Sequence, residues 1–302
     1  MPADPATAPV ASRADEAREL EAGLDALQAA PPRVGGRERL RRATMALLGP
    51  AVALAVLLVL WQGTVSLGLR PRYVMPGPTD VATAFGRLWH RGDVQAAVLT
   101  SLERGIVGFV VAVLIATPIG LVVARVRWVR RAFGPLVSGL QVLPSVAWVP
   151  AAIIWFGLTD GTVYFVVLMG AVPSIINGLV SGIDHVPPLY TGVGRVLGAS
   201  PVQLIRWVVL PAALPGYLAG LRQGWAFSWR SLMAAEIIAV GGSIGFGLGS
   251  LLQQGRDLQA MSTVIVASIL ILVIGVLVEL AFFAPLERRL LRRRGLSPDR
   301  SR

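Results

Sequence analysis

Apolar residues along this chain gather into long runs that contain no charged side chain. Asp, Glu, Lys and Arg are all absent from residues 43–69, 105–124, 132–159, 161–183 and 258–278. Each run is at least 20 residues long, and about 20 apolar residues are enough for a helix to cross the hydrocarbon core of a bilayer. The pattern predicts an all-α integral membrane protein.

A sixth membrane span is predicted over residues 214–238, although this segment contains Arg222, Arg230 and Glu236. With six spans, 20 arginines lie on the side of the two termini and 5 on the other side. Arginine gathers on the cytoplasmic side of membrane proteins. Both termini are therefore expected in the cytoplasm, and the chain in the cytoplasmic (inner or plasma) membrane. The other spans are expected at residues 45–67, 105–124, 135–157, 162–182 and 260–281.

Two polar tails flank the predicted six-helix domain, which covers residues 43–285. Residues 1–42 are rich in alanine, proline and charged residues. Either a short helix at residues 12–30 or a disordered, loosely docked tail fits this composition. Residues 286–302 are expected to form a basic cytoplasmic C-terminal tail.

Composition limits the chemistry that the chain can perform. It has no cysteine and only two histidines, His90 and His185, which lie in different polar segments, so no metal site is expected. All 28 basic residues are arginine, whereas a phosphate-binding Walker loop requires a lysine. No paired carboxylates or serine–histidine arrangement lies in the spans, so we expect no catalytic residue and no bound cofactor. The arginines flank the spans, which argues against nucleic-acid binding.

The longest predicted cytoplasmic connection, residues 184–213, has the pattern of a helix–turn–helix elbow between the fourth and fifth spans. Pro188 can open a first short helix. Ser200 can cap a second helix that has Pro201 at its first position, and Pro211 is expected to end it. A plain structural connector would have the same pattern.

This elbow resembles the EAA motif of bacterial ABC importer permeases. Gly198 corresponds to the motif glycine, nine residues separate it from Val208, and the Leu-Pro ending falls at Leu210 and Pro211. The chain departs from the family pattern at the front, where a Gly-Val-Gly stretch replaces Glu-Ala-Ala. The resemblance implies a coupling helix that docks on a separate ATPase subunit, with contacts from Gly192, Val193, Gly194, Gly198, Ala199, Ser200, Leu210 and Pro211.

Flanking segments extend the resemblance over residues 47–290. They read MPGPTDV at 75–81, TSLERGIVGF at 100–109, LPSVAWVPAAIIWFG at 143–157 and AAEIIA at 234–239. The chain is most similar to the branch of this family that serves nitrate, sulfonate and taurine uptake, and within it to aliphatic sulfonate permeases.

The resemblance implies a type I importer fold and several partners. These are a second permease copy in a homodimer, two ATPase subunits that bind ATP and Mg, and an extracytoplasmic substrate-binding protein. An aliphatic sulfonate is the expected substrate. The alternatives are nitrate, taurine, a vitamin or pyrimidine precursor, or an ATP-independent secondary transporter.

Polar residues in the fifth predicted span are the candidates for the substrate path. Eight helical steps place Arg230 about 12 Å beyond Arg222 and within about 80° of the same face. If both face the dimer axis, they would attract an anion; snorkelling or structural ion pairing is the alternative. The candidate path residues are Arg222, Trp229, Arg230 and Glu236.

Two other segments have weaker functional signals. Trp148, Trp155 and Phe156 are expected to serve as packing anchors. The glycine-rich residues 241–250 are expected on the outer side, as a flexible gate or as a contact for the substrate-delivery protein.

Overall fold

Every regular element that the computed structural model describes, in residues 36–68 and 71–293, is a helix. This confirms the all-α prediction. The chain divides into two compact units, residues 1–60 and 61–302. The helix predicted at residues 12–30 lies outside the described residues.

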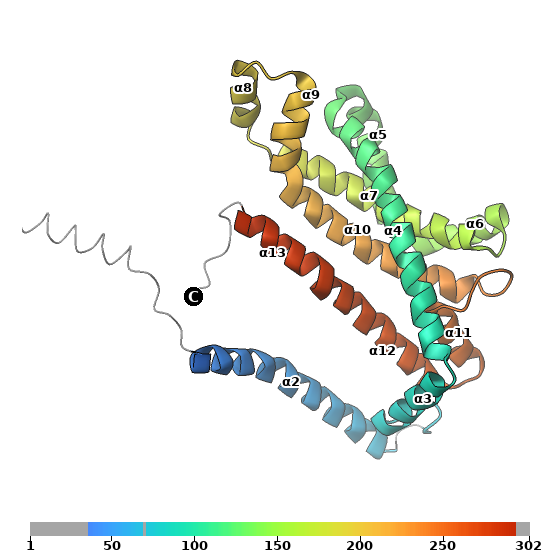
Figure 1. Ribbon diagram of the computed structural model, residues 1–302. Coiled ribbons are helices and arrows are strands. Elements are labelled where there is room, and N and C mark those ends of the chain that lie inside the picture. The colour runs from blue at the N-terminus through green and yellow to red at the C-terminus, as the bar shows by residue number, and fades with distance from the viewer. Residues whose placement is uncertain (1–35, 69–70, 294–302) are drawn as a thin grey trace, which may run out of the picture. The chain divides into compact units, whose positions relative to one another are not determined.

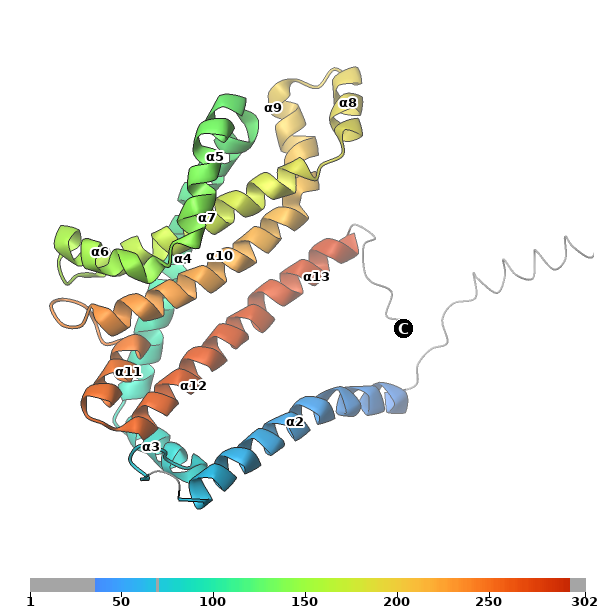
Figure 2. The same cartoon turned by 180° about the vertical axis from the view of Figure 1, so that it is seen from behind.

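The first unit contains most of α2 (Gly36–Ser66), and the remaining helices belong to the second unit (Figures 1 and 2). Those of the second unit are α3 (Pro78–His90), α4 (Asp93–Arg125), α5 (Arg127–Val142), η1 (Ser145–Trp148), α6 (Val149–Phe156), α7 (Asp160–Asp184), α8 (Pro188–Val196), α9 (Pro201–Gln203), η2 (Leu204–Val209), α10 (Leu210–Ile238), α11 (Leu248–Asp257), α12 (Met261–Val278), η3 (Glu279–Phe283) and α13 (Ala284–Arg293).

Five helical segments of the described chain are long and apolar enough to cross a membrane, and a bent helix pair makes a sixth if it counts as one span. This agrees with the predicted number of spans. The five are Leu48–Ser66, Asp93–Arg125, Asp160–Asp184, Pro201–Ile238 and Met261–Arg292, and the bent pair is Arg127–Val142 with Ser145–Phe156.

The third predicted span is not the continuous helix that the sequence pattern indicates. The chain bends by 96° between α5 and η1. At this break Leu143 has φ −70° and ψ 122°, the extended conformation that a following proline favours. Pro144 therefore breaks this span, which corrects the prediction of one helix over residues 135–157.

Three helical stretches are missing from the sequence-based prediction. The short helices α3 and α11 both begin after a glycine, and Asp80 accepts a hydrogen bond from the Gly77 N–H at 2.9 Å. At the C-terminal end, η3 and α13 continue the last span to Arg293. Part of the predicted C-terminal tail is thus helical.

The packing centre of the second unit is the pair α7 and α10, which lie side by side in both views (Figures 1 and 2). Of the 18 most apolar consecutive residues of α7, 56% are buried, whereas 11% of the corresponding residues of the last span are buried. A side chain on Gly178 would overlap the backbone of Gly220, and one on Gly216 would overlap the backbone of Gly182. Small residues let helices in a membrane approach closely and gain van der Waals contact.

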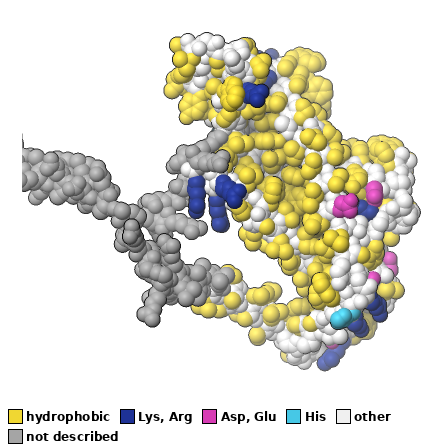
Figure 3. All heavy atoms as spheres, viewed as in Figure 1, with side chains coloured by type: hydrophobic (Ala, Val, Ile, Leu, Met, Phe, Trp, Pro, Cys, Tyr) yellow, Lys and Arg dark blue, Asp and Glu magenta, His cyan; other side chains and the backbone are white. Residues whose placement is uncertain are grey.

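On the face of the second unit shown in Figure 3, apolar side chains cover much of the surface and the charged ones gather toward its margins. Leu114 of α4 is 68% exposed and Leu272 of α12 is 65% exposed. So large an exposed apolar surface is typical of a protein that meets lipid.

We expect Gly220→Ala to destabilise the protein, because the added methyl group meets the backbone of α7. Overpacking of this kind costs about 1–3 kcal/mol. Gly139→Ala in α5 is the matched control, since nothing lies within 4 Å of its added methyl group. Thermal unfolding of the purified protein in detergent measures both; an equal midpoint for the two variants would contradict the packing described.

Candidate functional site

A helical elbow connects the ends of α7 and α10 and extends beyond them (Figures 1 and 2). Its first arm is α8, which begins at Pro188 as the sequence predicts. The turn contains Gly198 in a left-handed conformation (φ 79°), which glycine adopts without the steric cost other residues incur.

The second arm begins with the predicted cap. The Ser200 hydroxyl accepts a hydrogen bond from the Gln203 N–H at 3.4 Å, and the Gln203 side chain accepts one from the Ser200 N–H at 2.8 Å. This reciprocal pair is a capping box. Pro201 follows Ser200 at the first helical position, where its missing N–H costs nothing.

Pro211 does not end the second arm, which corrects the prediction. A π turn, η2, follows α9, and the Leu210 N–H donates to the Ile205 carbonyl five residues earlier. Pro211 then lies at the start of α10, directly after this π turn. The helix consequently continues from Pro201 to Ile238, over 38 residues.

The two arms of the elbow pack through Gly194. It is buried, and a methyl group there would overlap the side chain of Leu204. Gly192 has open space instead. The structure therefore assigns different packing to the two glycines that stand where the family has Glu and Ala.

An apolar face of the first arm is exposed. Its members are between 51% and 87% exposed and recur at helical spacing: Leu189, Val193, Val196 and Leu197. Among the residues that sequence analysis assigned to coupling, Val193 lies on this face, Gly198, Ala199 and Ser200 form the turn and cap, and Leu210 and Pro211 begin α10.

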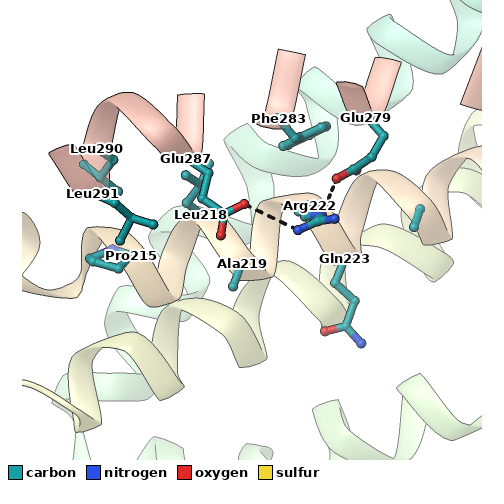
Figure 4. A pocket seen from close by; sticks show the side chains of 11 residues that line it. Pro215, Leu218, Ala219, Arg222, Gln223, Glu279, Phe283, Glu287, Leu290 and Leu291 are labelled. Carbon is teal, nitrogen blue, oxygen red and sulfur yellow. Dashed lines mark hydrogen bonds and ion pairs between the residues drawn. The ribbon is translucent and has the colours of Figure 1, made fainter. Parts of the chain in front are cut away.

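Arg222 lies between α10 and the C-terminal helices, in a cavity of about 440 Å³ (Figure 4). Its guanidinium forms ion pairs with Glu279 and, at 3.4 Å, with Glu287. Arg222 thus ties α10 to η3 and α13, the ion pairing that sequence analysis held as an alternative.

Arg230 lines a different cavity, of about 360 Å³, at the break between α5 and η1. Its Nε donates to the Ala226 carbonyl at 3.1 Å, and its guanidinium lies 4.5 Å from the ring centroid of Phe227. Within the described residues, no ion pair involves Arg230. Among these residues Arg230 is therefore a cation without an ion-pair partner.

Polar side chains on the other helices share this second cavity with Arg230. Gln141 and Ser145 line it. Gln141 accepts a hydrogen bond from Asn177 at 2.7 Å and donates one to Ser174 at 3.2 Å. These contacts fix the side chain of Gln141 at the wall, so an anionic solute would find a cation and polar groups already in place.

Trp229 lies in the core of the second unit. Its ring stacks on Trp225 with centroids 6.0 Å apart, and its N–H donates to the Ile271 carbonyl at 3.2 Å. The aromatic residues of the third span also pack together: the rings of Trp148, Trp155 and Phe156 all contact Phe165. This matches the expected role as packing anchors.

Glu236 is completely buried and pairs with Arg104 at 3.2 Å. The sequence pattern does not indicate that Arg104 is the partner of Glu236, although both residues lie in segments that carry the family resemblance. The glycine-rich stretch packs against this pair: a side chain on Gly247 would overlap the Glu236 carboxylate, and α11 already begins at Leu248. In the described residues, no group of three or more His, Cys, Asp or Glu is placed to hold a metal ion.

Because Gly194 is the contact point of the two elbow arms, we expect Gly194→Ala to displace the Leu204 side chain and loosen the contact between the arms. Amide hydrogen exchange over residues 188–209 should then become at least several-fold faster. Gly192→Ala, two residues away with free space, should leave the exchange rates unchanged. Equal exchange in the two variants would show that the arms do not depend on this contact.

This chain is similar in sequence to a known family of membrane transport proteins. Residues 116–292 match the family described as "Binding-protein-dependent transport system inner membrane component". The taurine transport system permease protein TauC of Escherichia coli (strain K12) is 30% identical over 242 residues, which are 78% of this chain and 86% of TauC. The riboflavin transport system permease protein RibX of Chloroflexus aurantiacus is 34% identical over 228 residues, which are 75% of this chain and 83% of RibX.

A solved structure supports the fold. A chain of the MetNI methionine ABC transporter, in an inward-facing conformation, matches with a TM-score of 0.56 at 19% identity, covering 66% of this chain and 96% of that chain. The family match spans more than half of the sequence. This chain belongs to the family of inner-membrane permease components of binding-protein-dependent ABC importers.

Proposed function

We propose that this chain is the permease subunit of an ATP-driven importer for a small anion, and that an aliphatic sulfonate is the substrate. The observation that carries the proposal is the elbow with its exposed apolar face, inserted between the two most tightly packed helices of the matched region. In the family of ABC importer permeases a separate subunit hydrolyses ATP, and this chain lacks the lysine of a Walker loop.

The apolar face of α8 is the docking surface for that ATPase in our proposal. Leu189, Val193 and Val196 lie within one side of the helix and are all exposed. Exposed apolar residues that gather on one face mark interaction sites. The missing glutamate of the family motif leaves apolar contact as the main source of affinity at this position.

The transport path in this proposal lies between two identical copies of the chain, each with its own ATPase subunit that binds ATP and Mg. Closure of the ATPase pair would draw the two elbows together and rock the helices between inward-open and outward-open states, a rigid-body switch. An extracytoplasmic binding protein would deliver the substrate to the side opposite the elbows, with both termini in the cytoplasm.

The sulfonate assignment rests on Arg230 and on the similarity to a taurine permease. Arg230 supplies a positive charge in a cavity that Gln141 and Ser145 also line, and a planar guanidinium suits the oxygens of an oxyanion. The similarity to a riboflavin permease keeps a vitamin as the second candidate, and nitrate and taurine fit the same cation.

We expect Val196→Asp to abolish stable association with the ATPase, because a carboxylate would have to be desolvated in an apolar contact. Co-purification of the ATPase should fall at least tenfold and uptake should be lost. Arg195→Gln, on a neighbouring side of α8, is the control and should leave both within twofold. Retained association, or uptake that continues without ATP, would favour a secondary transporter.

We expect Arg230→Ala to lower uptake of ethanesulfonate in proteoliposomes at least tenfold, since the cation of the path is removed. Arg230→Lys, which keeps the charge but loses the planar fork, should retain part of the rate. Uptake of riboflavin is the parallel measurement. An unchanged ethanesulfonate rate and preference in Arg230→Ala would remove Arg230 from the path, and selective uptake of riboflavin by the unaltered protein would replace the sulfonate assignment.

A further inference from the structure

An ion-pair network lies at the ends of α7 and α10 that are opposite the elbow. Arg104 of α4 is 4% exposed and Glu236 is fully buried. The Arg104 Nη1 lies 3.2 Å from the Glu236 Oε1, and its Nη2 lies 2.6 Å from the Asp160 Oδ1. Asp160 begins α7 and Glu236 lies in the last turn of α10. One arginine therefore joins both helices of the central pair.

The same carboxylate also fixes the beginning of α11. The Glu236 Oε2 accepts hydrogen bonds from the Ser101 hydroxyl at 2.7 Å and from the Gly249 N–H at 3.0 Å. The Leu248 N–H donates to the Ser101 hydroxyl at 2.8 Å. An anion is stabilised at a helix N-terminus by the unpaired N–H groups there.

The loop between α10 and α11 is held from two sides. On one side, the Gly245 carbonyl accepts a hydrogen bond from the Arg104 Nη1 at 3.1 Å. On the other side, the Ser243 N–H donates to the Leu158 carbonyl at 3.1 Å, in the turn between α6 and α7. The network thus connects α4, α7, α10, α11 and this loop.

Stability alone does not require charges in such a place. A buried ion pair is often replaced by neutral groups of similar shape without loss of stability, whereas removal of one partner leaves an uncompensated charge. What the charges add here is directional bonding between elements from distant parts of the chain, because Arg104 and Glu236 are 132 residues apart in the sequence.

We propose that Arg104 and Glu236 are positioning residues of the transport cycle, which pass the movement of the elbow on to α4, α11 and the loop at residues 241–247. This inference rests on the proposed function. The helix that begins in the elbow at Pro201 ends at Ile238, so the elbow and Glu236 occupy the two ends of one helix about 57 Å long.

The route between these ends is stiff. Close packing of α10 against α7 at Gly178 and Gly220 prevents one helix from sliding independently of the other. Packed interfaces change between discrete arrangements and do not deform continuously. Displacement of the elbow therefore moves the far ends of α7 and α10, where Arg104 and Glu236 bind α4, α11 and the loop at residues 241–247.

The chain has no cysteine, so a single Ser243→Cys substitution places a unique probe on the exposed loop. The unaltered permease, reconstituted with its ATPase, should show at least a fivefold change in labelling rate by a membrane-impermeant maleimide when vanadate traps the nucleotide state. In the double variant Arg104→Gln with Glu236→Gln, which removes both buried charges and leaves only the half-exposed Asp160 without its ion pair, the change should fall below twofold while ATP hydrolysis persists.

Two further variants make the test decisive. Asp160→Asn alters a side chain that is half-exposed, so the protein should fold, and the labelling change should fall at least twofold. Arg130→Gln with Asp184→Asn removes an exposed ion pair at the other end of α7 and should leave the full change.

The outcomes separate the two claims. A fivefold change that persists in both the Arg104/Glu236 double variant and Asp160→Asn would overturn the positioning role. If the double variant does not fold, an unaltered labelling change in Asp160→Asn alone would overturn it. Absence of any nucleotide effect in the unaltered complex would instead overturn the proposed coupling to an ATPase.

Discussion

The close crossing of α7 and α10 is the constraint on which the rest of the second unit depends. Glycines at the contact let the two backbones approach closely, so that Gly178 lies against Gly220 and Gly182 against Gly216. In a membrane this contact cannot be driven by exclusion of water, so it depends on packing of backbone against backbone. Because both helices continue into the elbow at one end and into the Arg104 network at the other, the pair sets the geometry of both.

Much of this arrangement could be predicted from the sequence, because it depends on local signals. Charge-free runs locate the spans, and Pro188, Ser200 and Pro201 mark the beginnings of both elbow arms through capping chemistry that involves only neighbouring residues. The family resemblance extends the same information, since its motifs lie at these positions.

Two kinds of feature could not be predicted. Some depend on contacts between distant parts of the chain, and others depend on whether a proline bends a helix or is accommodated within it. Pro144 and Pro211 both lie in apolar surroundings, yet the first bends the chain by 96° and the second is accommodated after a π turn. The partner of Glu236 is 132 residues away, which no periodicity indicates. Glycines at 241–249 suggest flexibility by composition, whereas Gly247 and Gly249 are needed because Glu236 packs directly on them.

Charge is distributed in this protein according to what each arginine does. Arg104 and Arg222 are paired with carboxylates, which neutralise their charge within the fold. Arg230 instead faces a cavity among apolar and polar side chains. That contrast separates the residues that hold the helices together from the one that our proposal assigns to the solute.

The central claim is that the elbow transmits the work of a separate ATPase, and a cross-link tests it most directly. Since the chain has no cysteine, Val196→Cys gives a single thiol on the exposed face of α8 for a short bifunctional reagent. We predict a cross-link to the ATPase subunit that stops ATP-driven uptake, with uptake restored when a cleavable linker is cut. Uptake that proceeds at the full rate after complete cross-linking, or a thiol that never reaches a nucleotide-hydrolysing subunit while transport continues, would contradict the account.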